Sequence, residues 1–146
     1  MKIPINILLA DDDSDDRFFF SLALKEVLSS FQLNTAVDGE ELMNYLIKNS
    51  ETPPDVLFLD LNMPKKNGSE CLAEIKRNSK LKNIPVVIYS TSVQKDTADV
   101  FYKSGAFYYV RKCEFEELKR VLKQVLFLIE TQNEQPERKN FIVNPD

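Results

Sequence analysis

Three short runs of the chain are almost entirely apolar, and each leads directly into polar residues. They cover residues 5–10 (INILLA), 56–59 (VLFL) and 86–89 (VVIY). A strand buried on one face alternates apolar and polar side chains, whereas a parallel strand covered by helices on both faces does not. The three runs therefore predict central strands of a parallel sheet. A weaker run at 31–37 and another at 107–110, expected at the sheet edge, predict two more strands.

Helical patterns follow each of these five runs. The strongest covers residues 114–130, where apolar side chains recur every three or four positions. The other four cover residues 13–27, 41–48, 68–78 and 94–104. Five strand–helix repeats joined by right-handed crossovers predict an α/β fold, with a doubly wound, five-stranded parallel sheet and helices on both faces.

The length of 146 residues fits one domain, which we place at residues 1–130. Residues 131–146 are rich in Gln, Glu, Asn and Pro and are expected to form a C-terminal tail. Within that tail, residues 141–143 (FIV) are the one group expected to dock on a surface.

Composition argues against several classes of function. The formal net charge is −4, so direct nucleic-acid binding is not expected, and the absence of histidine removes the commonest general base. Cys71 and Cys113 form no CxxC pair, so no zinc site is expected. Two thiols in a chain of this size indicate a reduced, cytoplasmic protein and not a disulfide framework. No apolar run approaches the ~18 residues of a membrane span, so no membrane association is expected. The first 13 residues end in three aspartates and do not resemble a signal peptide.

Polar side chains that could bind a ligand or take part in a reaction follow the predicted strands directly. Residues 11–13 (DDD) come after the first strand, Asp60 after the third, residues 90–92 (STS) after the fourth and Lys112 after the fifth. In doubly wound folds ligands bind beyond the carboxyl ends of the strands, so these side chains are expected to share one pocket. Asp60 is the most informative of them, because a charged, unpaired carboxylate is costly at the end of a buried run.

Such a pocket suits phosphoryl chemistry. Clustered carboxylates repel one another unless a cation joins them, and an oxygen-only ligand set suits Mg²⁺. A hydroxyl group and Lys112 opposite the carboxylates suit phosphate oxygens, and an aspartate can itself attack a phosphoryl group.

Each group also has a simpler interpretation when it is taken alone. Residues 11–13 could merely precede a helix, for which residues 13–16 (DSDD) supply a cap and first-turn negative charge. Residues 90–92 could be a cap, and Lys112 could be a solvated surface lysine. The placement of all of them at strand ends favours a functional site.

The motifs LLADDD, LFLDLNMPKKNG, PVVIYSTS and GAFYYVRK, in this order, resemble the response-regulator receiver domains of two-component systems. The resemblance covers about residues 5–130, and DLNMP with YSTS is similar to small single-domain regulators of the phytochrome-associated type. It implies a flavodoxin-like fold with strand order 2-1-3-4-5. It also implies a protein that is not an enzyme acting on an external substrate, but one that catalyses its own phosphorylation and dephosphorylation.

The resemblance also implies a role for each residue of the pocket. Asp60 would be the phosphoacceptor, and Mg²⁺ would be held by Asp11, Asp12, Asp60 and the backbone carbonyl of Asn62. The phosphoryl-contacting and switch residues would be Ser90, Lys112 and Tyr109. The family usually has proline after the lysine, often with a cis bond, whereas this chain has Cys113, for which we expect a trans bond. Cys113 could be a redox-sensitive thiol with a lowered pKa or an incidental small residue.

The implied partners are a sensor histidine kinase or a phosphotransfer protein, a downstream protein target, and a second copy of the chain in a homodimer. The changing face would be formed by residues 94–104, 107–110 and 114–130. Two alternatives remain open. One is a phosphohydrolase with an aspartate nucleophile, which usually has DxD where this chain has Asp60-Leu61-Asn62. The other is a degenerate receiver that acts as a constitutive binding module.

Overall fold

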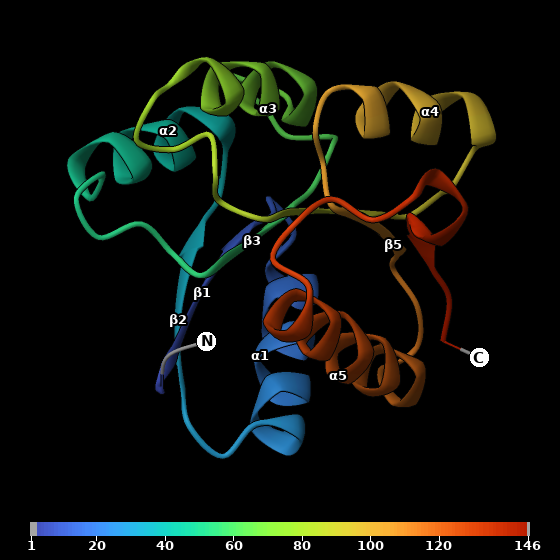
Figure 1. Ribbon diagram of the computed structural model, residues 1–146. Coiled ribbons are helices and arrows are strands. Elements are labelled where there is room, and N and C mark those ends of the chain that lie inside the picture. The colour runs from blue at the N-terminus through green and yellow to red at the C-terminus, as the bar shows by residue number, and fades with distance from the viewer. Residues whose placement is uncertain (1–2, 146) are drawn as a thin grey trace.

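The computed structural model describes residues 3–145 as one parallel β-sheet between two layers of helices (Figure 1). The strand order is β2-β1-β3-β4-β5-β6, so the predicted order of the first five strands is confirmed. The strands are β1 (Ile5–Ala10), β2 (Phe31–Ala36), β3 (Val56–Leu59), β4 (Val86–Ser90), β5 (Tyr108–Arg111) and β6 (Ile142–Val143).

Five α-helices alternate with the first five strands, as predicted. They are α1 (Ser14–Val27), α2 (Gly39–Lys48), α3 (Gly68–Arg77), α4 (Lys95–Lys103) and α5 (Phe115–Thr131), and a 3₁₀ helix, η1 (Arg138–Asn140), precedes β6. Figure 1 shows α1 and α5 on one face of the sheet and α2, α3 and α4 on the other. Within residues 3–145, no helix combines the length and the apolar character needed to cross a membrane.

The central strands are buried on both faces, which explains their continuous apolar sequences. Every residue of β3 and β4 is buried. Leu57 and Leu59 of β3 pack in the core beneath α2, α3 and α4, whereas Val56 and Phe58 pack in the core beneath α1 and α5. Each fully buried side chain of this kind contributes about 1.5–3 kcal/mol to the free energy of folding. The sheet therefore holds the loops at its ends in fixed positions.

Side-chain caps start three helices at the edge of the sheet where the strands end. Asp13 accepts hydrogen bonds from the backbone N–H groups of Asp15 and Asp16 at the start of α1. Asp38 caps α2, and Asn67 belongs to a capping box at the start of α3. Of the three consecutive aspartates after β1, the third therefore has the structural role that the simpler interpretation gave it.

The prediction of a five-stranded sheet with β5 at its edge is wrong, because the chain returns and adds β6. This strand pairs with β5 in parallel register, with Tyr109 opposite Ile142 and Val110 opposite Val143. The backbone N–H of Tyr109 donates to the carbonyl of Phe141 at 2.9 Å. The physical reason is the apolar sequence of residues 141–143, which gains from burial against a sheet edge that would otherwise leave hydrogen-bonding groups unpaired.

Phe141 is the buried anchor of this C-terminal segment. Its side chain has no exposed surface, and its ring packs edge-on against Tyr102 of α4 and Tyr109 of β5, with centroid distances of 5.2 and 6.2 Å. The docking predicted for residues 141–143 is thus confirmed, and the surface they dock on belongs to the same chain.

Polar contacts hold the segment before Phe141 against α4. The Gln135 side-chain amide donates to the carbonyls of Tyr102 and Ala106 at 2.7 and 2.8 Å. The Tyr102 hydroxyl donates to the carbonyl of Pro136 at 2.7 Å, and Arg138 pairs with an aspartate of α4 at 2.7 Å. The segment therefore covers part of α4 and one edge of β5.

We predict that Phe141→Ala lowers the free energy of unfolding by about 3 kcal/mol, because it leaves a cavity between two aromatic rings. Phe127→Ala removes the same group from a side chain that is 61% exposed and should change stability by only about 0.5 kcal/mol. Urea denaturation followed by circular dichroism measures both. Equal effects of the two substitutions would show that the C-terminal segment does not stabilise the fold.

Candidate functional site

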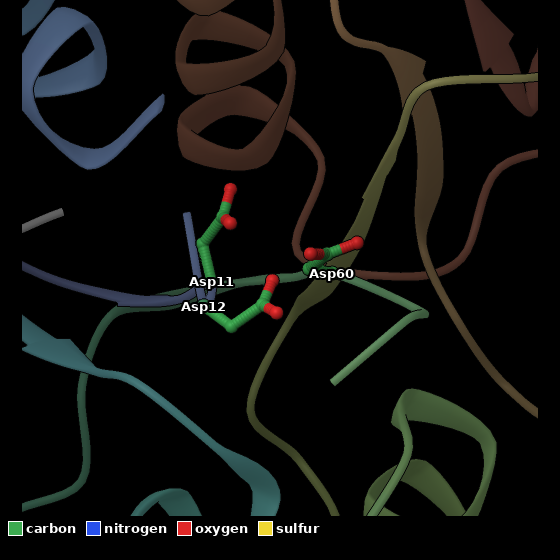
Figure 2. Close-up of side chains that lie close together, drawn as sticks. All are labelled: Asp11, Asp12 and Asp60. Carbon is green, nitrogen blue, oxygen red and sulfur yellow. The ribbon is translucent and has the colours of Figure 1, made fainter. Parts of the chain in front are cut away.

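Two neighbouring strands carry the predicted aspartates at their carboxyl ends. Asp11 and Asp12 follow β1, Asp60 follows β3, and these two strands are paired directly. The backbone N–H of Asp60 donates to the carbonyl of Ala10 at 2.9 Å, which extends the ladder and holds Asp60 beside the β1 terminus. One carboxylate oxygen from each aspartate lies within 4.8 Å of the other two, and Figure 2 shows the three side chains rising from the strand ends.

The three carboxylates differ in their exposure to solvent. Asp11 is fully buried, Asp60 is 5% exposed and Asp12 is exposed. Asp11 Oδ2 is buried without a hydrogen bond of good geometry. This oxygen pairs with the Lys112 ammonium group at 2.8 Å, but one ammonium group cannot balance three clustered carboxylates. The remaining negative charge fits a hard divalent cation, and the exposed side at Asp12 leaves room for the waters that such a cation keeps. The residues therefore fit a divalent metal ion.

Burial raises the pKa of the Asp60 carboxyl from 3.8 to about 6. Lys112 opposes this rise in pKa, Asp11 adds to it, and the backbone N–H of Asn62 opposes it. A raised carboxyl pKa means that the folded state binds the proton more tightly than the unfolded state. The resulting stabilisation is complete below pH 3.8 and is lost as the pH rises through about 6. At neutral pH the ionised carboxylate of Asp60 thus opposes folding.

Lys112 brings a positive charge into this cluster. Its Nζ lies 2.8 Å from Asp11, 2.8 Å from Asp16 and 3.5 Å from Asp60. Burial by itself would lower the pKa of Lys112, but its short contacts with Asp11 and Asp16 outweigh it, and the pKa is raised. The ammonium group is therefore charged at any physiological pH. The backbone N–H of Lys112 donates to the carbonyl of Ser90 at 2.7 Å, which holds the start of the β5–α5 loop against the end of β4.

Asp16 is a member of the cluster that the sequence did not single out. It lies in the first turn of α1, and the sequence explained it as favourable charge at a helix N-terminus. Its contact with Lys112 joins residues 96 positions apart. The spacing along the chain gave no signal for this contact, because Asp13 caps α1 and Asp12 lies outside the helix. Only the packing of α1 against the β5–α5 loop shows that Asp16 meets Lys112.

Ser90 and Asn62 lie at the same edge of the sheet. Ser90 ends β4, the strand paired with β3, and is 2% exposed. Asn62 follows Asp60 by two residues, and its backbone N–H donates to Asp60 Oδ1 at 3.3 Å. A Cβ atom at Gly68 would lie 2.6 Å from the backbone oxygen of Asp60, so only glycine allows the start of α3 to approach this closely. The loop after Asp60 is therefore held against the site.

Tyr109 lies on β5, which β4 separates from the strand that carries Asp60. Its side chain is 1% exposed, and its hydroxyl donates to the carbonyl of Ser92 at 2.9 Å. Ser92 lies two residues beyond Ser90, so Tyr109 contacts the loop that begins at the site. Phe101 and Phe141 pack on the Tyr109 ring, with centroid distances of 6.5 and 6.2 Å. The residue is enclosed by α4 and the C-terminal segment, not placed at an open edge.

Cys113 has no sign of an activated thiol. Its peptide bond with Lys112 is trans, as predicted for a residue other than proline. Burial raises the pKa of the Cys113 thiol, and Glu117 adds to this rise. A redox role that depends on a lowered pKa is therefore not supported, and the interpretation of Cys113 as a small loop residue fits the structure better.

Comparison with known proteins identifies the family. The profile of the response regulator receiver domain matches residues 7–123. Response regulator Rcp1 of Synechocystis sp. is 37% identical over 126 residues, with 84% of each chain covered. The probable methanogenesis regulatory protein FilR2 of Methanothrix harundinacea is 29% identical, with 84% of this chain and 81% of that protein covered.

Solved structures agree with these sequence matches. The Mn²⁺-bound form of Rcp1 is similar with a TM-score of 0.74 and 34% identity, over 88% of this chain and 94% of that one. The phosphorylated cyanobacterial phytochrome response regulator RcpA gives 0.77 and 33%, over 85% and 92%. Taken with the doubly wound fold and the aspartates at its strand ends, these similarities show that the chain belongs to the response regulator receiver domain family.

Proposed function

We propose that the chain accepts a phosphoryl group on Asp60 from the phosphohistidine of a sensor histidine kinase or a phosphotransfer protein. The observation that carries this proposal is the convergence on Asp60 of two further carboxylates and the Lys112 ammonium group, 3.5 Å away. A nearly buried carboxylate in such surroundings is a suitable nucleophile, because its charge is compensated by groups already in place.

In the transfer step, an Asp60 carboxylate oxygen forms a bond to phosphorus as the bond between phosphorus and the donor imidazole nitrogen breaks. The imidazole leaves with the electron pair of that bond and takes up a proton from solvent. Lys112 stabilises the negative charge on the transferred oxygens, and Ser90 offers a hydroxyl group to one of them. Asp11, Asp12, Asp60 and the Asn62 carbonyl would hold Mg²⁺, which supplies further neutralisation of that charge.

Loss of the phosphoryl group needs only water as the second reactant. The acyl phosphate on Asp60 is then hydrolysed to the free carboxylate and inorganic phosphate. We infer that the chain catalyses both its own phosphorylation and this dephosphorylation, and that it does not turn over an external substrate. A phosphohydrolase is disfavoured, since Asp60-Leu61-Asn62 lacks the second aspartate of DxD. A degenerate binding module is disfavoured by the intact set of acidic and basic side chains.

We further infer that the output is a change in the face made by α4, β5 and α5, within a receiver domain at residues 1–130. Tyr109 supports this idea, because its hydroxyl contacts the loop that follows Ser90 and its ring contacts α4. The described part of the C-terminal segment, residues 132–145, adds to the same face through Phe141. A downstream protein target or a second copy of the chain would then meet a surface built partly from this segment.

Asp60→Asn should abolish phosphorylation, because it keeps the shape of the side chain and removes the nucleophile. Intact mass is followed over time with Mg²⁺ and acetyl phosphate, so that no partner is needed. The wild type should gain one phosphoryl group, and so should Asp55→Asn, which alters the opposite end of the same strand. Continuous consumption of acetyl phosphate would indicate a phosphohydrolase, and absence of any adduct in the wild type would indicate a degenerate module.

Asp12→Ala should weaken Mg²⁺ binding by more than about tenfold, because few protein ligands hold this cation and each one matters. Calorimetric titration of the unphosphorylated protein measures the affinity, which we expect to be weak even in the wild type. Asp15→Ala removes the same charge from the nearby first turn of α1 and should retain most of the affinity. If the two substitutions weaken binding equally, Asp12 acts through general charge and is not a ligand.

Beryllofluoride, a phosphoryl mimic that binds the acceptor carboxylate, should shift the amide resonances of Tyr109 and of the flanking residues in α4. The reason is the chain of contacts from Ser90 through the following loop to the Tyr109 hydroxyl. Two-dimensional ¹H–¹⁵N spectra with and without the mimic measure this effect. Shifts confined to the loops around Asp60, with α4 and β5 unchanged, would refute the proposed output face.

A further inference from the structure

Lys112 is a flexible side chain that must be held in one place to act on a phosphoryl group. Its backbone is fixed to Ser90, but four rotatable bonds separate the backbone from the ammonium group. The bond to Cys113 adds no proline constraint to the loop. Next to the side chain lies a cavity of about 300 Å³, whose walls include Tyr89, Lys112 and Phe115. The ammonium group therefore has space to move into unless a contact restrains it.

Three carboxylates surround the ammonium group, and they are not equivalent. Asp11 and Asp16 are both 2.8 Å away, yet only the contact with Asp16 has the geometry of a hydrogen bond. Asp11 and Asp60 belong to the proposed metal and acceptor set, so their charge is shared with the cation or altered by phosphorylation. Asp16 lies outside that set. It is the one carboxylate of the three whose charge stays available to Lys112 throughout the cycle.

The helix that carries Asp16 is fixed to the sheet. The backbone N–H of Asp16 donates to the Asp13 cap at 3.0 Å. One turn further on, Phe20 is fully buried and packs edge-on against Phe58 and Tyr89, with centroid distances of 5.0 and 5.6 Å. The Tyr89 ring also lies 5.3 Å from Lys112 Nζ. Asp16 is thus attached to a rigid element that packs beside Lys112.

The ammonium group has three N–H donors, and this number explains the arrangement. Asp16 accepts a hydrogen bond from one donor at 2.8 Å, while Asp11 Oδ2 at 2.8 Å and Asp60 Oδ2 at 3.5 Å are ion-pair partners without that geometry. The transferred phosphoryl oxygens would arrive on the Asp60 side. The hydrogen bond to Asp16 therefore fixes the ammonium group while a donor remains for the acceptor side.

We propose that Asp16 is a positioning residue for phosphoryl transfer, which holds the Lys112 ammonium group in the orientation that serves the Asp60 acceptor. This inference rests on the proposed function. Asp16 itself touches neither the acceptor nor the phosphoryl group, and it acts only through Lys112.

The test measures the rate of phosphorylation by acetyl phosphate at saturating Mg²⁺, by intact mass. Asp16→Ala should slow the reaction about tenfold, since a misplacement of about 1 Å can cost up to about 100-fold. Asp16→Asn keeps an acceptor oxygen without its charge and should slow it only about threefold, because charge-assisted hydrogen bonds are about twice as strong as neutral ones. Asp15→Ala is the matched control, since it removes the same charge from the adjacent, exposed position of α1 and should leave the rate unchanged.

A double substitution separates positioning from a general effect on the helix. Lys112→Ala should slow the reaction about 100-fold, as expected for loss of a group that stabilises transition-state charge. Adding Asp16→Ala to Lys112→Ala should slow it no further, because Asp16 then has nothing to position. A further tenfold loss in the double variant would overturn the inference and show that Asp16 acts through the fold of α1.

Other outcomes are equally decisive. If Asp16→Ala matches Asp15→Ala, Asp16 has no positioning role, although the proposed function stands. If Asp16→Ala is faster than the wild type, Asp16 competes with the phosphoryl group for Lys112, and the inference is wrong. If the wild type and Asp15→Ala acquire no phosphoryl group at all, the proposed function fails, and this inference fails with it.

Discussion

The ion pairing of Lys112 with the carboxylates at the ends of β1 and β3 is the interaction on which the site depends. Without it, Asp11 and Asp60 would be two buried negative charges within 4.8 Å of each other, an arrangement that folding strongly disfavours. Even with it, burial keeps the pKa of Asp60 at about 6. The apolar strands beneath supply stability that offsets this cost, and the result is a carboxylate held in one place at the end of β3.

The same interaction connects parts of the chain that are distant in sequence. Lys112 follows β5, Asp11 follows β1, Asp16 belongs to α1 and Asp60 follows β3. A change of charge on Asp60 is therefore felt by the β5–α5 loop and by α1 at once. Tyr109, which lies on β5, also contacts the site region, because its hydroxyl donates to the loop that follows Ser90. The site thus has physical contacts with both layers of helices.

Much of the fold could be predicted from the periodicity of apolar residues and from where the apolar runs end. The features that the sequence did not predict have identifiable causes. The buried strands β1, β3 and β4 were clear, because burial on both faces leaves a continuous apolar sequence. The sixth strand was missed, because Ile142–Val143 is too short to show any periodicity. Its pairing depends on the exposed edge of β5, a feature that exists only once the sheet is formed. Asp16 was missed for a similar reason, since its partner is 96 residues away.

The sequence by itself determined the order of strands and helices and the chemical groups that follow each strand, because these depend on local propensities and on where apolar runs end. It also determined that Asp60 would be unusual, since a carboxylate at the end of a buried run needs a partner. Only the tertiary structure decided which carboxylates form ion pairs with Lys112. It alone also decided that Phe141 of the C-terminal segment packs on Tyr109. These contacts are made between distant segments, and their geometry follows from how helices and strand edges pack.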